Sequence, residues 1–357
     1  MAPLDAKTDP MTENDAAPDS RLHKLMHHPW SLRIATVLWL CILAIAVWAL
    51  HRQWKDLKFS EFLAALGRIG PKHICLALLF TTLSYLCNSS LDFWAMRHQR
   101  SHHVPWLVAL RTSFVAMVFS INAGGALLTG GSVRIRTYSR FGMKPLQIGA
   151  IIIFISVVAW AGYCLNVGIN LTLSKDALPN LPSWISASWA GPAFLAMSVS
   201  VVLLFMAVEA GKLTKWVPKK WLPKEEDRVR HRLSLIPVAT LASASDYLFA
   251  GLTLRALFPE VHGIHLTTFL AMFALSQAAA SISHVPAGAG VLEFLVTALL
   301  ANTTDTASLA SSLMAFRVIF YMLPFCLAAV ILFSWEVWLK KQESVKASDP
   351  PAEPAEG

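Results

Sequence analysis

The feature that most limits the fold of this chain is a series of apolar runs close to bilayer-spanning length. A helix of about 20 apolar residues crosses the hydrocarbon core of a bilayer. The chain of 357 residues is 55% hydrophobic, and the runs leave little sequence for a soluble domain. We therefore predict an all-α, polytopic membrane helical bundle. Six full spans are expected, at Ile34–Leu50, Ile74–Leu91, Leu146–Asn170, Gly191–Ala210, Leu235–Phe258 and Leu309–Trp335.

Two further apolar segments are interrupted by small and helix-breaking residues. The first covers 106–122 and breaks at 123–131, and the second covers 267–283 and breaks at 284–290. Interrupted segments in matching places of two halves point to a transport site, because the backbone groups that a break frees must face protein or a wet cavity. We predict two re-entrant broken-helix hairpins. The break residues are Asn122, Gly124, Gly125, His284, Pro286, Gly288 and Gly290.

Basic residues set the expected orientation in the membrane. Residues 211–234 contain eight Lys or Arg and three acidic residues, and 130–145 contain basic residues without an acid. Cytoplasmic loops beside anionic lipid have this excess, so the net charge of +8 indicates a membrane rather than a nucleic acid as partner. Both termini are then cytoplasmic, and the hairpins enter from opposite faces. Because the elements recur after about 160 residues, we predict an inverted 4+4 repeat, over 30–170 and 171–340.

The polar ends of the chain are predicted to be disordered tails, at 1–29 and 341–357, on either side of a transmembrane domain at 30–340. The first tail lacks the basic-then-apolar order of a signal peptide. The five cysteines are scattered through apolar spans without metal-site or disulfide spacing. There is no nucleotide-binding P-loop pattern either. We expect no catalytic residue, no metal site and no cofactor.

Ionisable residues at membrane depth are functional candidates because they are costly to bury there. Asp246 lies near the middle of its span, Glu293 follows the second break, and Arg317 lies in the last span. Arg111 lies in the first hairpin. We assign all four to a translocation path. Two plainer alternatives stay open: Asp246 and Arg317 form a structural pair that locks two helices, and Glu293 caps the half-helix that follows the break.

The segment after the first break has the features of an anion site. Glycines let backbone amides approach an anion, and a helix start adds positive potential. Two arginines add forked donors suited to a phosphodiester. The alternative is an ordinary basic flank that touches bulk lipid phosphates. The residues assigned to lipid-phosphate binding are Gly130, Gly131, Ser132, Arg134 and Arg136.

Three motifs resemble the lysylphosphatidylglycerol synthase transmembrane region, which is the flippase-like domain of the bacterial multiple peptide resistance factor. They are LTGGSVRIRTYSRFGM at 128–143, VPAGAGVLE at 285–293 and FRVIFYMLP at 316–324. The resemblance covers residues 30–340. Ala287 and Ala289 stand where the family has a more glycine-rich run. A soluble aminoacyl-transferase domain follows in full-length members, whereas this chain ends soon after its last span, so synthase activity is not expected.

The resemblance implies a bacterial inner-membrane, flippase-like protein that moves a phospholipid between leaflets and is not an enzyme. Aminoacylated phosphatidylglycerol is one such lipid. The partners implied are membrane phospholipids, together with a second copy of the chain or a separate lipid-modifying enzyme, and no nucleic acid. Two alternatives stay open, because a fold does not fix a function. One is a non-transporting membrane partner of a lipid-modifying enzyme, and the other is an ion- or solute-coupled transporter of the same architecture.

Overall fold

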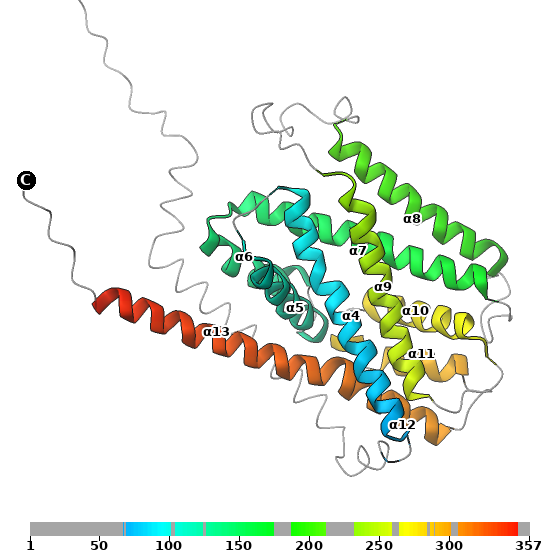
Figure 1. The fold of residues 1–357 in the computed structure, drawn as a ribbon. Coiled ribbons are helices and arrows are strands. Elements are labelled where there is room, and N and C mark those ends of the chain that lie inside the picture. Colours follow the sequence, from blue (N-terminus) through cyan, green and yellow to red (C-terminus); the bar gives the residue numbers. More distant parts are fainter. Residues whose placement is uncertain are drawn as a thin grey trace, which may run out of the picture. The chain divides into compact units, whose positions relative to one another are not determined.

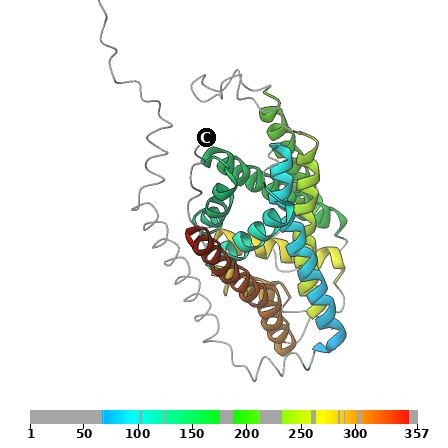
Figure 2. The ribbon, with the colours of Figure 1, turned by 60° about the vertical axis from the view of Figure 1, so that its left-hand side comes forward.

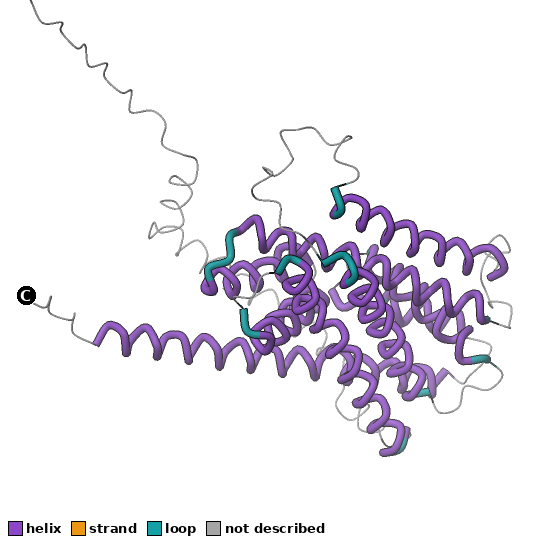
Figure 3. Tube along the Cα trace, turned by 45° about the horizontal axis from the view of Figure 1, so that its top comes forward, coloured by secondary structure: helices purple, strands orange, loops and turns teal. Residues whose placement is uncertain are grey.

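The computed structural model confirms the all-α membrane bundle. Every regular element within the described residues is a helix (Figure 3). Five helices are long and apolar enough to cross a membrane, at Pro71–His98, Pro145–Leu173, Ser188–Glu209, Leu235–Leu257 and Leu309–Trp335. They correspond to five of the six predicted spans. The described residues are 67, 69–100, 104–123, 126–174, 187–211, 232–258, 264–283, 286–288, 290–300 and 306–348, all within the unit Trp48–Gly357.

The sixth predicted span, Ile34–Leu50, and the predicted tail at 1–29 lie outside the described residues. The second predicted tail, at 341–357, is partly helical, because α13 (Leu323–Ser348) continues into it. Lys, Gln, Glu and Ala dominate residues 340–347, and these residues favour a helix. The helix therefore reaches into the predicted tail as far as Ser348.

Two long helices, α4 (Pro71–His98) and α9 (Leu235–Leu257), pack side by side (Figures 1 and 2). A proline in the first turn starts α4, where its missing N–H costs no helical hydrogen bond. The next long helix, α7 (Pro145–Leu173), starts in the same way and contacts both α9 and α8 (Ala187–Glu209). These helices form the frame against which the shorter, broken helices pack.

The first predicted hairpin consists of α5 (Trp106–Ala123) and α6 (Ala126–Tyr138), which pack against each other. The predicted break residues Gly124 and Gly125 lie outside the described residues, and α6 already begins at Ala126, five residues before the end of the predicted break at 123–131. Gly130 and Gly131 lie inside α6. A glycine inside a helix lowers the stability of the helix by only about 1 kcal/mol relative to alanine. Gly130 is the one that packs closely against α5. The prediction that both glycines present exposed amides beside a helix start is wrong.

The second predicted break agrees with the structure. The first helix of that hairpin, α10 (Leu266–Ile282), is followed by a short turn, η5 (Pro286–Gly288), and by α11 (Val291–Leu300). Gly288 and Gly290 have φ values of 61° and 84°. Ala287 also has a positive φ, of 52°, although a left-handed conformation costs a non-glycine residue about 1–2 kcal/mol. His284 lies outside the described residues.

The last span is formed by α12 (Thr306–Phe316), the π-helical segment η6 (Arg317–Met322) and α13. Contacts in the two halves are reciprocal: α7 packs against α9 and α10, while η6 packs against α4 and α13 packs against α5. An inverted repeat produces this pattern, because it exchanges the first-half and second-half partners. The turn η5 also contacts α5, so the two broken helices meet. The repeat and the depth of the hairpins stay predictions.

Replacement of Gly288 by alanine tests the geometry of the second break. A Cβ at this position would lie 2.7 Å from the Cβ of Ala280, and the φ of 61° disfavours any side chain. We expect Gly288→Ala to destabilise the protein by about 2–4 kcal/mol, measured as thermal unfolding in detergent. Ala287→Gly is the matched control, because it relieves a left-handed alanine and should not lower the unfolding temperature. If Gly288→Ala unfolded at the wild-type temperature, the conformation of Gly288 described for η5 would be contradicted.

Candidate functional site

A row of polar side chains follows one face of α4, and we call it the polar stripe. Its members are three or four residues apart, a spacing that places them on the same side of a helix. All are buried except Asn88, which is half-buried. Each hydrogen-bonds to a residue of another helix. The polar stripe consists of Thr81, Ser84, Asn88 and Asp92.

The middle of the polar stripe faces Asp246 of α9. Asp246 is 4% exposed, and its carboxylate accepts hydrogen bonds from the Ser84 hydroxyl at 2.5 Å and from the Asn88 amide at 2.7 Å. One step further along, the hydroxyls of Thr81 and Thr253 lie 3.4 Å apart. The alternative in which Asp246 pairs with Arg317 is therefore wrong. Asp246 instead joins α9 to α4 through neutral donors.

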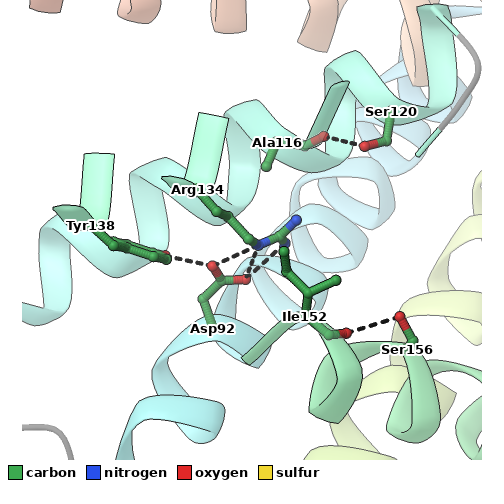
Figure 4. A network of polar contacts seen from close by, with 7 residues as sticks. All are labelled: Asp92, Ala116, Ser120, Arg134, Tyr138, Ile152 and Ser156. Atoms are coloured by element: carbon green, nitrogen blue, oxygen red, sulfur yellow. Dashed lines mark hydrogen bonds and ion pairs between the residues drawn. The ribbon is translucent and has the colours of Figure 1, made fainter. Parts of the chain in front are cut away.

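The far end of the polar stripe holds an ion pair (Figure 4). The Asp92 carboxylate accepts hydrogen bonds from Nε of Arg134 at 2.9 and 3.2 Å, and from its Nη2 at 2.8 Å. The Tyr138 hydroxyl donates to the same carboxylate at 2.5 Å. Arg134 and Tyr138 are four residues apart on α6, so both point toward α4. Asp92 is fully buried and Arg134 is 8% exposed, so this is a buried, charge-assisted contact.

Gly130 controls the surroundings of the Arg134 side chain. A Cβ on Gly130 would overlap the Ser120 hydroxyl and would lie 3.0 Å from the Ala116 carbonyl oxygen of α5. It would also lie 3.2 Å from Nη1 of Arg134. Among the described residues, the hydrogen bonds of this guanidinium use Nε and Nη2 only. Gly130 thus lets α6 approach α5, and Nη1 of Arg134 makes no hydrogen bond to a described residue.

The other residues of the predicted phosphate motif occupy different positions on α6. Gly131 is buried inside the helix, and Ser132 and Arg136 are half-buried. Arg136 is two residues from Arg134, which is roughly 200° around a helix. The two guanidinium groups therefore leave the helix on opposite sides. The structure does not form the predicted arginine pair, and Arg134 is the residue that it brings to the polar stripe.

A second polar cluster lies where α11 meets the last span. The Glu293 carboxylate accepts hydrogen bonds from Nε of Arg317 at 2.9 Å and from its Nη2, and forms an ion pair with this arginine. Its other oxygen accepts the backbone N–H of Gly290 at 2.8 Å. The alternative that Glu293 caps the half-helix is confirmed. Arg317 begins η6, and π-helical segments occur frequently at functional sites.

Side chains from neighbouring helices bind to η6. The Tyr85 hydroxyl of α4 donates to the Phe320 carbonyl at 2.8 Å. Nε2 of Gln277, on α10, donates to the Tyr321 hydroxyl at 3.2 Å. A π segment shifts the hydrogen bonding of the backbone, so some of its carbonyl groups need another donor. Tyr85 supplies such a donor from a neighbouring helix, whereas lipid cannot.

Two predicted residues of the first hairpin are placed elsewhere. The guanidinium carbon of Arg111 lies 3.7 Å from the centre of the Trp335 ring on α13, a cation–π contact outside the polar stripe. Asn122 lies in the last turn of α5, and its Nδ2 donates to the Val118 carbonyl at 2.9 Å. Its Oδ1 is buried without a hydrogen-bond partner among the described residues.

Sequence reasoning missed the residues of the polar stripe. The predicted span Ile74–Leu91 ends one residue before Asp92. Ser84 and Asn88 lie within that span and are not among the predicted site residues. The missed signal is the spacing of three or four residues between the polar positions, which indicates one helix face rather than scattered substitutions.

The Asp92–Arg134 pair can be tested by a double-mutant cycle. Asp92→Asn leaves the guanidinium buried without its counter-charge, so we expect a loss of about 3–5 kcal/mol in the free energy of unfolding. Arg134→Gln should cost a similar amount for the same reason. Thermal unfolding in detergent should show that the double variant loses much less than the sum of the two. Additive losses would contradict a direct pair.

Comparison with known proteins agrees with this architecture. The model of the family described as the lysylphosphatidylglycerol synthase TM region matches residues 31–335. The uncharacterized protein slr0712 of Synechocystis sp. is 25% identical over 308 residues, which are 85% of this chain and 92% of the relative. The inner membrane protein YbhN of Escherichia coli (strain K12) is 26% identical over 328 residues, which are 88% of this chain and 96% of the relative.

Proposed function

The chain belongs to the lysylphosphatidylglycerol synthase transmembrane family, and on this premise we propose that it moves a phospholipid between the leaflets of a bacterial inner membrane. The observation that supports the proposal is the polar stripe of α4, together with its partners Asp246 on α9 and Arg134 on α6. The printed name of the Escherichia coli relative, an inner membrane protein, supports the location. The activity proposed is transport, without a catalytic step.

A lipid headgroup that enters the hydrocarbon loses its water, and this loss is the main barrier to flipping. Hydroxyl, amide and guanidinium groups along α4 and its partners can replace those lost hydrogen bonds one after another. The acyl chains need no such groups and can stay in lipid. In this proposal two irregular segments, η6 packed against α4 and η5 packed against α5, also offer backbone polar groups to the headgroup.

In this proposal Arg134 binds the phosphate that all glycerophospholipids share. Asp92 fixes the plane of the guanidinium through Nε and Nη2, while Nη1 is open to an anionic oxygen. By the positive-inside rule, the basic residues that follow α6 favour a cytoplasmic position for this end. Asp246, Glu293 and Arg317 stay assigned to the path beyond it. An aminoacylated phosphatidylglycerol carries this same phosphate and is one lipid that the proposal covers.

Substitution of Arg134 is the direct test. We expect Arg134→Lys to keep the charge but to reduce flipping at least about tenfold, because an ammonium group cannot bind Asp92 and a phosphate through one planar fork. Asp92→Ala combined with Arg134→Ala removes the pair without leaving a buried charge, and should abolish flipping. Loss of leaflet asymmetry of fluorescent phosphatidylglycerol in proteoliposomes measures the rate.

Arg140→Ala is the matched control, since Arg140 is an exposed arginine just after α6. It should flip lipid at the wild-type rate. Size-exclusion chromatography and thermal unfolding establish that each variant is folded. Wild-type flipping by the folded double variant would overturn the role of Arg134. A wild-type protein that binds lipid without flipping it would favour the non-transporting partner of a lipid-modifying enzyme.

A further inference from the structure

Asp246 differs from the other acidic side chains that the structure describes. Asp92 is paired with Arg134 at 2.8 Å, Glu293 is paired with Arg317, and Glu209 lies 3.4 Å from Nε2 of His98. Asp246 has no Lys, Arg or His within ion-pair distance among the described residues. A buried carboxylate without a counter-charge is strongly disfavoured, because burial removes its hydration and nothing replaces the lost stabilisation.

The position of Asp246 makes this imbalance severe. It lies eleven residues from each end of α9 (235 to 246 and 246 to 257), or about 16 Å at 1.5 Å per residue. This places it close to the middle of a membrane-spanning helix, where an ionised side chain is most costly. It is 4% exposed, so water from either surface does not solvate it in this conformation.

Among the described residues, no charged side chain interacts with Asp246, including those of α4, the helix packed against it. Two helices that contact α9, α10 and α12, contain no titratable residue. Glu209 is the acidic residue of α8 and is paired with His98. On α9 itself, Arg255 lies near the end and donates to the Phe258 carbonyl. The titratable groups that interact with Asp246 are phenols and a thiol, neutral at physiological pH: Tyr85, Cys87 and Tyr247.

The hydrogen bonds of Asp246 fit both of its protonation states. The Ser84 hydroxyl, 2.5 Å away, can donate to a carboxylate or accept from a carboxylic acid, since a hydroxyl does both. The Asn88 amide donates at 2.7 Å to the other oxygen, which is an acceptor in either state. The site can therefore gain or lose a proton without leaving a broken hydrogen bond.

We infer that Asp246 is a proton-binding site and that lipid moves along the polar stripe only while Asp246 is protonated. The proton comes from water at the membrane surface and converts the carboxylate to the acid, which cancels the charge that would repel a phosphodiester beside it. Asn88 is one helical turn from Asp92, so the neutralised group borders the Arg134 end of the stripe. The transport half of this inference rests on the proposed function, whereas the proton site does not.

Infrared titration of the purified protein tests the proton site without any transport assay. Acidification should produce the carbonyl-stretching band of a protonated carboxylic acid, and Asp246→Asn should lose that band. Glu209→Gln is the matched control and should keep it. Ser84→Ala removes a donor to the ionised form, so the band should persist to higher pH, which keeps the test valid where Asp246→Asn does not fold. An unchanged band in both Asp246→Asn and Ser84→Ala would overturn the inference.

Flipping in proteoliposomes tests the transport half. The wild-type rate should fall by about tenfold per pH unit above the titration midpoint, since only the protonated fraction is competent. In Asp246→Asn, whose amide cannot ionise, the ratio of rates at two pH values should fall to about one. Wild-type pH dependence in this variant would overturn the coupling. Absence of flipping by the wild-type protein would refute the proposed function, while the infrared titration would still decide the proton site.

Discussion

Polar groups buried in a membrane bundle need hydrogen-bond partners within the protein. Helix α4 carries a row of such groups, the polar stripe. Its apolar faces could pack against many helices, but its polar stripe fits only neighbours that present matching groups. Asp246 fixes α9 against it, and Arg134 with Tyr138 fixes α6. The pairs also set the helices at one register, because a shift of one residue would remove every partner. Stability and position of the candidate site thus depend on the same contacts.

The irregular backbone obeys the same constraint. The break after α10 is closed by Glu293, which accepts the Gly290 N–H and pairs with Arg317 at the start of η6. Tyr85 of α4 then donates to the Phe320 carbonyl of that π-helical segment. These contacts join the second hairpin, the last span and α4. Departures from regular helix therefore occur where several helices supply side chains to satisfy them, as lipid cannot.

The sequence predicts the spans well because bilayer length and apolar runs are local properties. It predicts the second break for a similar reason, since Pro286 and the neighbouring glycines stop a helix wherever they occur. The predicted first break is too long, because glycine also occurs where a helix needs a small residue, and Gly130 lies inside α6 in close contact with α5. The partners of Asp246, Glu293 and Arg317 depend on which helices become neighbours. Periodicity within one span does not contain that information, although the spacing of Ser84, Asn88 and Asp92 does mark the face that will need partners.

The sequence separation of the polar stripe from its partners has a consequence for synthesis. Asp92 meets Arg134 after 42 further residues, but Ser84 meets Asp246 only after 162. During translation α4 must therefore leave the ribosome, and enter the membrane, well before α9 exists. Until then Ser84 and Asn88 have to be satisfied by water, by the insertion machinery or by lipid headgroups. The helix that organises the bundle therefore enters the membrane early but gains its last hydrogen-bond partners late. A chain truncated before Asp246 would leave the polar side chains of α4 without these partners and would expose the helix to quality-control proteases.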